Sequence, residues 1–148
     1  MSDNIVIQNI SEQDLDEIVK IGLSTPELHL SDKNYYYDQG ELASFIKSPN
    51  DIFLVAKIDG QIAGYRLATF NPYLREAYLM DIVVKPEFRN LGIANKLYEE
   101  TFKILNKKKC QWAWALVKSD NYKMVEILSK KGFRQGSLFK AFYKVGPF

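Results

Sequence analysis

The 148-residue sequence predicts an α/β fold of the α+β class, in which one mixed sheet is covered by helices. A clear β-hairpin occupies residues 52–70, in the middle of the chain. Segments with helical periodicity alternate with short apolar segments on both sides of that hairpin. The sequence contains no repeat, low-complexity tract or linker, so residues 1–148 are expected to form a single domain.

The N-terminal part of the chain predicts one strand and two helices. Residues 4–10 alternate apolar and polar side chains, which indicates a strand. Ser11 is placed to cap a helix that ends near Gly22. Few periodic signals occur over residues 23–40, which are expected to form a mobile or short-helical segment. The spacing then predicts a helix over residues 39–47.

The middle of the chain predicts three strands. Residues 52–58 and 61–70 flank the turn dipeptide Asp59-Gly60 and should form an antiparallel hairpin. A further strand is expected over residues 77–84, and Pro86 ends it because proline lacks the N–H of the ladder.

The C-terminal part predicts a crossover and a final hairpin or strand. A helix over residues 90–105 should connect the strand at 77–84 to a parallel strand at 110–117. A helix over residues 121–131 follows, and residues 133–145 are expected to form one or two last strands.

Composition excludes several classes of protein. With 47% hydrophobic and 26% charged residues the chain is globular, and a net charge of +2 does not favour nucleic-acid binding. The chain has one cysteine, Cys110, and one histidine, His29, so neither an internal disulfide nor a Cys/His metal cage is expected. The longest apolar run, residues 112–117, is too short to span a membrane, and a cytoplasmic location is expected.

The segment after the strand at 77–84 has the features of an anion site. The first N–H groups of a helix have no internal acceptor and lie at the positive end of its dipole. Gly92 and Ala94 let a phosphate approach the backbone, and Arg89 adds a permanent cation. In the alternative interpretation, Gly92 and Ala94 only allow tight packing of the helix. Walker A and G-x-G-x-x-G motifs are missing, which disfavours nucleoside triphosphates and dinucleotides.

Three motifs in order resemble the GNAT superfamily of N-acetyltransferases over about residues 5–145. The acetyl-CoA signature is matched by Val84-x-Pro86 and Arg89-x-x-Gly92-x-Ala94. The second signature is matched by Asn121 and Lys131-Gly132-Phe133, and the central hairpin by residues 53–65. The resemblance implies a mixed, mostly antiparallel central sheet of six to seven strands, about four flanking helices, and a splay between the fourth and fifth strands.

The same resemblance implies which residues bind acetyl-CoA. The strand end would pair its backbone with the pantetheine arm, the following loop and helix start would hold the pyrophosphate, and Asn121 would hydrogen-bond the pantetheine. An ordinary helix N-cap is the alternative role of Asn121. The assigned residues are Ile82, Val83, Val84, Arg89, Asn90, Leu91, Gly92, Ile93, Ala94, Asn95 and Asn121.

The family's usual proton donor is replaced in this sequence. A tyrosine often stands four residues before the Gly-Phe pair, and that position is Leu128 here. Strict alternation places Asp81 on the opposite face from Tyr78, where a structural hydrogen bond is expected. The catalytic candidates are then Tyr78 and Tyr143 as proton donors and Glu76 as a base acting through water; Tyr122, Glu27 and His29 are further candidates.

The resemblance implies transfer of an acetyl group from acetyl-CoA to a primary amine, which attacks the thioester directly in a ternary complex. The amine could belong to a small molecule or to a protein. The alternative is a non-catalytic acyl-CoA-binding sensor or interaction module of the same fold. No metal, nucleic-acid or membrane partner is expected, and the protein should be a monomer or a homodimer.

Overall fold

The computed structural model describes residues 4–28 and 36–136 of the chain. They belong to two compact units, Met1–Leu116 and Val117–Phe148. The first unit contains the sheet and most of the helices, and the second contains one described helix. The expectation of a single domain over residues 1–148 stays a prediction.

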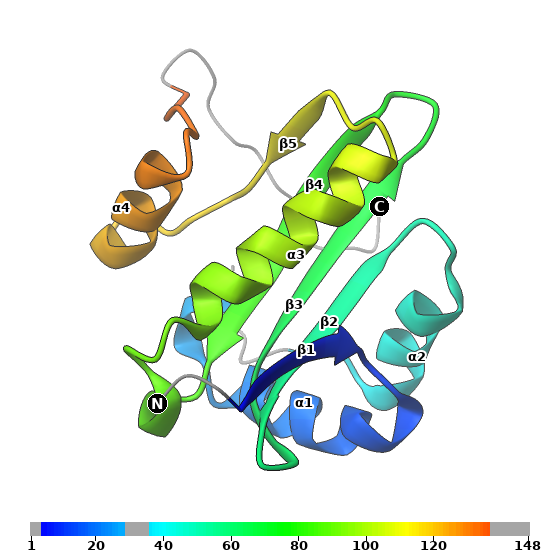
Figure 1. Cartoon of the computed structure of the whole chain (residues 1–148), viewed down its shortest axis with the longest axis vertical. Helices are drawn as coiled ribbons and strands as arrows, with labels where there is room; N and C mark the ends of the chain where they lie inside the picture. Colours follow the sequence, from blue (N-terminus) through cyan, green and yellow to red (C-terminus); the bar gives the residue numbers. More distant parts are fainter. Residues whose placement is uncertain (1–3, 29–35, 137–148) are drawn as a thin grey trace, which may run out of the picture. The chain divides into compact units, whose positions relative to one another are not determined.

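The sheet of the first unit has five strands in the spatial order β1-β2-β3-β4-β5. Neighbours pair antiparallel from β1 to β4, and β5 runs parallel to β4, as the crossover predicted (Figure 1). The bounds are β1 Ile5–Asn9, β2 Ile52–Ile58, β3 Gln61–Asn71, β4 Glu76–Val84 and β5 Trp112–Trp114. The mixed, mostly antiparallel sheet is therefore confirmed.

The predicted number of six to seven strands is not matched, because the described residues form five. The strand expected at 110–117 is reduced to three residues. Residues 133–136 do not form a strand, and the remainder of the last predicted segment lies outside the described residues.

Four α-helices are present among the described residues, as predicted. Short 3-10 turns η1 (Glu12–Asp14), η2 (Pro26–Leu28) and η3 (Pro86–Phe88) accompany them. The helices are α1 Leu15–Leu23, α2 Gln39–Lys47, α3 Ile93–Lys107 and, in the second unit, α4 Tyr122–Lys130. The crossover helix α3 begins three residues later than predicted because Asn90 and Gly92 have φ values of 65° and 80°, which are not helical.

The helices of the first unit cover both faces of its sheet. Side chains of α1 and α2, such as Ile18 and Leu42, share one core with Tyr65 and Val83 of the sheet. On the other face, α3 packs on strands β1 to β4, and Figure 1 shows it lying along β4 and β3. Burying both faces explains why β2 and β3 are almost continuously apolar rather than alternating.

A β-bulge interrupts the regular alternation of β4. Leu67 of β3 pairs with Asp81, and Thr69 pairs with Tyr78. Between these pairs β3 advances by two residues and β4 by three, so β4 contains one extra residue, Met80. Because Leu67 and Thr69 lie on one face of β3, Asp81 and Tyr78 share that face as well. The prediction that they lie on opposite faces is wrong, since it assumed an uninterrupted strand.

Candidate active site

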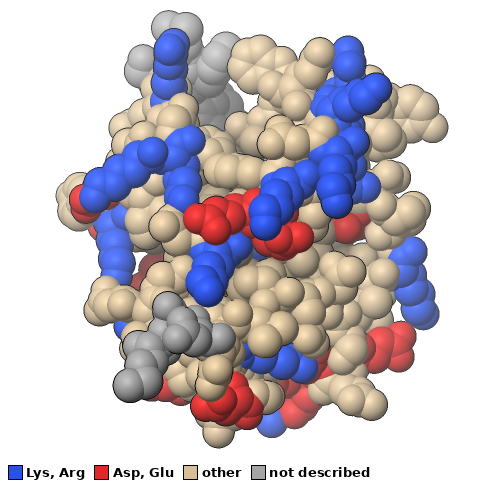
Figure 2. All heavy atoms as spheres, viewed as in Figure 1, with Lys and Arg blue, Asp and Glu red and all other residues tan. Residues whose placement is uncertain are grey.

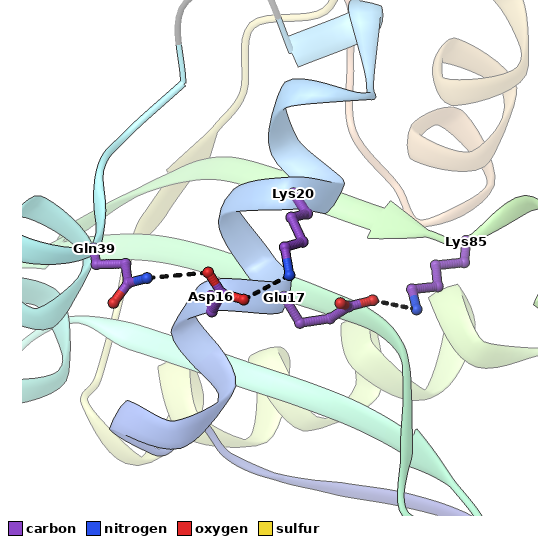
Figure 3. Close-up of polar contacts among 5 residues, drawn as sticks. All are labelled: Asp16, Glu17, Lys20, Gln39 and Lys85. Carbon is purple, nitrogen blue, oxygen red and sulfur yellow. Dashed lines mark hydrogen bonds and ion pairs between the residues drawn. The ribbon is translucent and has the colours of Figure 1, made fainter.

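The loop that connects β4 to α3 is fixed at its beginning. The backbone N–H of Lys85 donates to the Ala63 carbonyl of β3 at 2.9 Å. The Lys85 ammonium also pairs with Glu17 of α1 at 2.5 Å, and Figure 3 shows Glu17 extending from α1 to meet it. In the same view Asp16 bonds Lys20 and Gln39, which connects α1 to α2. The start of the loop is therefore held by both the sheet and α1.

The first backbone N–H groups of α3 have no acceptor within the helix. Gly92 is the N-cap residue and has no side chain to cap the helix, and the first turn contains no acidic residue. The first intrahelical bond runs from the N–H of Lys96 to the Gly92 carbonyl at 3.1 Å. The N–H groups of residues 93–95 thus lack intrahelical acceptors and lie at the positive end of a fifteen-residue helix. This arrangement favours an anion such as phosphate.

The geometry at Gly92 distinguishes the two interpretations of this glycine. A Cβ built on Gly92 would have no heavy atom within 4 Å, so tight packing is not the reason for a glycine here. Its φ of +80° is the reason, because other L-residues rarely adopt this conformation. The result is an exposed turn whose backbone a ligand can approach closely.

Arg89 lies at the carboxyl end of β4. Its Nε donates to the Val84 carbonyl at 3.3 Å, and the side chain is exposed. The hydrogen bond keeps a permanent positive charge beside the strand end from which the loop and α3 continue.

Within the described residues, one edge of β4 is unpaired along most of its length. β5 pairs only with the first three residues of β4, and the last pair is Tyr78 with Trp114. Because Lys85 directs its N–H to β3, alternation directs the backbone groups of Val84 and Ile82 to the opposite edge. No other described strand covers that edge, so β4 and β5 part after Tyr78. The splay between the fourth and fifth strands stays a prediction, with which the end of the pairing at Tyr78 agrees.

Asp81 is held from both faces of the sheet. On the α1 and α2 face, the Tyr65 hydroxyl donates to the Tyr36 hydroxyl at 2.8 Å, and Tyr36 donates to Asp81 Oδ2 at 2.9 Å. On the α3 face, Arg66 Nη1 donates to the backbone carbonyl of Asp81 at 3.4 Å. The expected structural hydrogen bond of Asp81 is present, and it belongs to a chain of three side chains.

Burial changes the acidity of this group. It raises the pKa of the Asp81 carboxyl to about 6, although the Tyr36 hydrogen bond and the Arg66 charge act in the opposite direction. Burial also raises the pKa values of Tyr36 and Tyr65, so both hydroxyls keep their protons at neutral pH. Asp81 is therefore ionised at pH 7.5 but is a stronger base than an exposed aspartate.

Arg66 is an unusual buried cation. It is 1% exposed, and its guanidinium carbon lies 4.5 Å from the centre of the Tyr98 ring of α3. Among the described residues, its Nε and Nη2 atoms have no hydrogen-bond partner. Burial lowers the pKa of this guanidinium. In the sequence, its burial is indicated only by its position, as a charged residue inside an otherwise apolar strand.

Two of the predicted catalytic residues lie on the described part of β4. Tyr78 is half-buried, and its ring stacks on Trp114 with 4.3 Å between the ring centres. Burial and the nearby Asp81 charge raise the pKa of its hydroxyl. Glu76 is half-buried at the first position of the strand. Tyr143 and His29 lie outside the described residues.

Asn121 and Leu128 belong to the second unit and to its helix α4. Asn121 is the N-cap residue, and its Oδ1 accepts a hydrogen bond from the Met124 N–H at 3.2 Å. This is the alternative role that the sequence allowed for it.

The predicted cofactor-binding residues from Ile82 to Asn95 lie together in the structure because they are consecutive in the chain. Sequence reasoning missed Tyr36, Tyr65 and Arg66.

The surface charge, the helices and the metal-binding side chains do not point to a particular partner. Figure 2 shows basic and acidic side chains interspersed on the same face, some in contact and others with uncharged areas between them. None of the described helices is long and apolar enough to cross a membrane. Within the described residues there is also no group of three His, Cys, Asp or Glu side chains that could hold a metal ion.

Comparison with known proteins agrees with this geometry. The model of the acetyltransferase (GNAT) family matches residues 17–133. An N-alpha-acetyltransferase of Saccharolobus solfataricus is 24% identical, and the alignment covers 97% of this chain and 88% of the relative.

Two solved structures show the same fold. The PaiA N-acetyltransferase of Thermoplasma acidophilum in complex with coenzyme A has a TM-score of 0.76 at 22% identity, over 88% of this chain and 89% of that one. An aminoglycoside acetyltransferase from an uncultured soil metagenomic sample, in complex with sisomicin, has a TM-score of 0.74 at 18% identity, over 97% and 98%. With its open β4 edge, free α3 N-terminus and matching family model, the chain belongs to the GNAT family of acetyltransferases.

Proposed function

We propose that this acetyltransferase moves an acetyl group from acetyl-CoA to a primary amine, which attacks the thioester directly. The observation that carries the proposal is the free N-terminus of α3 directly beyond the open edge of β4. Acetyl-CoA has a pyrophosphate at one end and an amide-containing arm leading to the thioester. An anion site continuous with backbone groups that no described strand pairs with suits both parts.

In this proposal the cofactor extends along one continuous segment. The N–H groups of Asn90 to Asn95 and the Arg89 guanidinium hold the pyrophosphate, and Gly92 permits the close approach. The backbone groups of Ile82 and Val84 pair with the pantetheine arm, with Val83 directed to β3 between them. The hydrogen bond from Asn121 to the arm stays a prediction from the family resemblance. The coenzyme A bound to the related PaiA structure supports this choice of cofactor.

Tyr78 is the proposed proton donor to the departing thiolate. A leucine at position 128 has no proton to donate, whereas Tyr78 lies at the point where β4 and β5 part. Its raised pKa keeps the hydroxyl protonated at neutral pH, as a general acid requires. Glu76 and Tyr143 stay predicted candidates for proton transfer.

The α-amino group of a peptide or protein is the proposed acceptor. The relative aligned over 97% of this chain is named an N-alpha-acetyltransferase. An α-amino group has a pKa of about 7.7–8.0, against about 10.4 for lysine, so far more of it is the nucleophilic free base at neutral pH.

Two measurements test the proposal. Acetyl-CoA should raise the melting temperature, since a ligand at a hundred times its Kd stabilises a protein by about 2.7 kcal/mol. Release of CoA thiol should then be measured with an unblocked lysine-free tetrapeptide, an N-blocked lysine peptide, a polyamine and an aminoglycoside. We expect the unblocked peptide to give the highest rate.

The outcomes separate the candidate functions. A melting shift without thiol release from any amine would contradict transfer and favour a non-catalytic acyl-CoA-binding module. Absence of a shift would contradict acetyl-CoA as the cofactor. Faster release with the N-blocked lysine peptide would contradict the α-amino acceptor.

A further inference from the structure

Asp81 is a buried carboxylate in the middle of β4. It accepts a hydrogen bond from the Tyr36 hydroxyl, which in turn accepts one from the Tyr65 hydroxyl of β3. We propose that Asp81 takes the proton from the attacking amine, and that Tyr36 and Tyr65 orient its carboxylate for this step. The inference rests on the proposed amine acetylation and adds the proton acceptor to it.

The bulge at Met80 gives Asp81 its position. It turns the carboxylate to the same face of β4 as Tyr78, the proposed proton donor. Asp81 also directly precedes Ile82, whose backbone faces the open edge of the strand. An amine that attacks a thioester held along this edge therefore reacts next to both groups. Asp81 is 8% exposed, so its carboxylate is shielded on most sides.

The orientation of the carboxylate is built by several parts of the chain. Tyr36 precedes α2, and its ring packs directly on Gly22 of α1, where an added Cβ would overlap it. Tyr65 of β3 then fixes the Tyr36 hydroxyl through a buried hydrogen bond. Tyr36 is the one side-chain hydrogen-bond donor that the described residues supply to the Asp81 carboxylate. The second carboxylate oxygen is thus left for another proton.

A purely structural role does not require a charge at this position. A neutral amide would accept the same hydrogen bond from Tyr36 without the cost of burying an ion. The chain has an aspartate and not an asparagine at this position, and its pKa of about 6 suits a general base at neutral pH. The titratable or charged groups that face or influence this network are Tyr36, Tyr37, Tyr65, Arg66 and Tyr78.

The proposed step balances as follows. The nitrogen lone pair forms the C–N bond, the C–S bond breaks, and its electron pair leaves on sulfur. One N–H proton passes to the Asp81 carboxylate, and the thiolate receives a proton from the Tyr78 hydroxyl. Solvent then moves the proton from Asp81 to the Tyr78 phenolate, so the products are the amide and free CoA thiol.

Asp81→Asn is the central variant, and Asp59→Asn in the exposed hairpin turn is its matched control. The acceptor is the unblocked lysine-free tetrapeptide or, if wild type does not use it, the amine of the panel with the highest rate. We expect Asp81→Asn to lower kcat about a hundredfold to ten-thousandfold. The melting shift with acetyl-CoA should be retained, and the melting temperature at pH 7.5 should not fall, because a buried charge is removed. Asp59→Asn should behave as wild type.

The pH dependence of kcat at saturating substrates separates a base from a structural residue. Wild-type kcat should rise with pH as Asp81 loses its proton, with a midpoint near 6, and the residual rate of Asp81→Asn should lack this rise. Tyr36→Phe removes a hydrogen bond that lowers the Asp81 pKa, so the midpoint should move to higher pH. Tyr73→Phe, at a 94% exposed position, should leave it unchanged.

Each outcome decides one question. Wild-type kcat and midpoint in a folded Asp81→Asn would overturn the role of Asp81 and leave the proposed function standing. If Asp81→Asn does not fold, an unmoved midpoint in Tyr36→Phe would overturn it instead. If acetyl-CoA does not raise the melting temperature of the wild-type protein and no thiol is released, the proposed function is wrong, and this inference with it.

Discussion

Two neighbouring regions, the end of β4 with the loop that leads into α3 and the network around Asp81, differ in which groups they present. The segment from Ile82 to Asn95 presents mainly backbone groups, is exposed at the α3 N-terminus, and is continuous in sequence. The network around Asp81 consists of buried side chains from the segment before α2, from β3 and from β4. The first region suits a ligand that arrives and leaves. The second suits a group whose acidity is fixed before any ligand binds.

The difference also separates binding from chemistry. Free N–H groups at an exposed helix end are solvated by water until an anion replaces it. Asp81 is 8% exposed, so its carboxylate is largely removed from water, and this desolvation raises its pKa. Changes in the first region should therefore alter cofactor affinity, and changes in the second should alter the rate of the bound complex.

Gly92→Glu should have the largest effect on the first region. It places an anion at the proposed phosphate site and a side chain at a φ of +80°. We expect no melting shift at an acetyl-CoA concentration that stabilises wild type, as measured by thermal unfolding.

Gly60→Glu is the matched control for this substitution. Gly60 has a φ of +81° and equally open surroundings, but it lies in the β2–β3 turn. It should lose similar intrinsic stability while keeping the full acetyl-CoA shift. If Gly92→Glu keeps the acetyl-CoA melting shift, the cofactor does not bind at the α3 N-terminus, and the distinction between a binding region and a catalytic region is wrong.

Tyr78→Phe should have a smaller effect, confined to the second region. The ring can keep its stack on Trp114, but the hydroxyl that we propose as the proton donor to the thiolate is lost. We expect kcat to fall about a hundredfold, while the acetyl-CoA melting shift stays as in wild type. The measurement is thiol release at saturating substrates.

The tyrosine result has a clear contrary outcome. If Tyr78→Phe keeps the wild-type kcat, water or another hydroxyl protonates the thiolate. If it instead loses the melting shift, Tyr78 belongs to cofactor binding, and the two regions are not separable.

Sequence predicted the locally encoded parts of the molecule. The hairpin turn at Asp59 and Gly60 was predictable because both residues have positive φ, which this dipeptide favours. The helix α2 matches its predicted bounds, Gln39–Lys47, because Asp38 and Glu41 form a capping box around its start. The turn at Gly92 before α3 was predictable for the same reason, since the loop, the glycine and the helix are consecutive in the chain.

The parts that depend on tertiary structure were not predictable. A single extra residue, Met80, reverses the face of Tyr78 relative to Asp81, and alternation alone contains no sign of it. Tyr36 stands in a run of three tyrosines, and only its packing on Gly22 distinguishes it from its neighbours. Likewise, β5 ends at Trp114, where its pairing with β4 ends, and the apolar run over residues 112–117 contains no sign of this end.

A structure of the protein with bound coenzyme A would test the central claim most directly. The account predicts pyrophosphate oxygens at hydrogen-bond distance, about 2.7–3.2 Å, from the N–H groups of residues 93–95. It also predicts that the pantetheine arm follows the open edge of β4 and that the sulfur lies beside Tyr78 and Asp81. A pyrophosphate bound away from the α3 N-terminus, or a sulfur directed away from that edge, would contradict it.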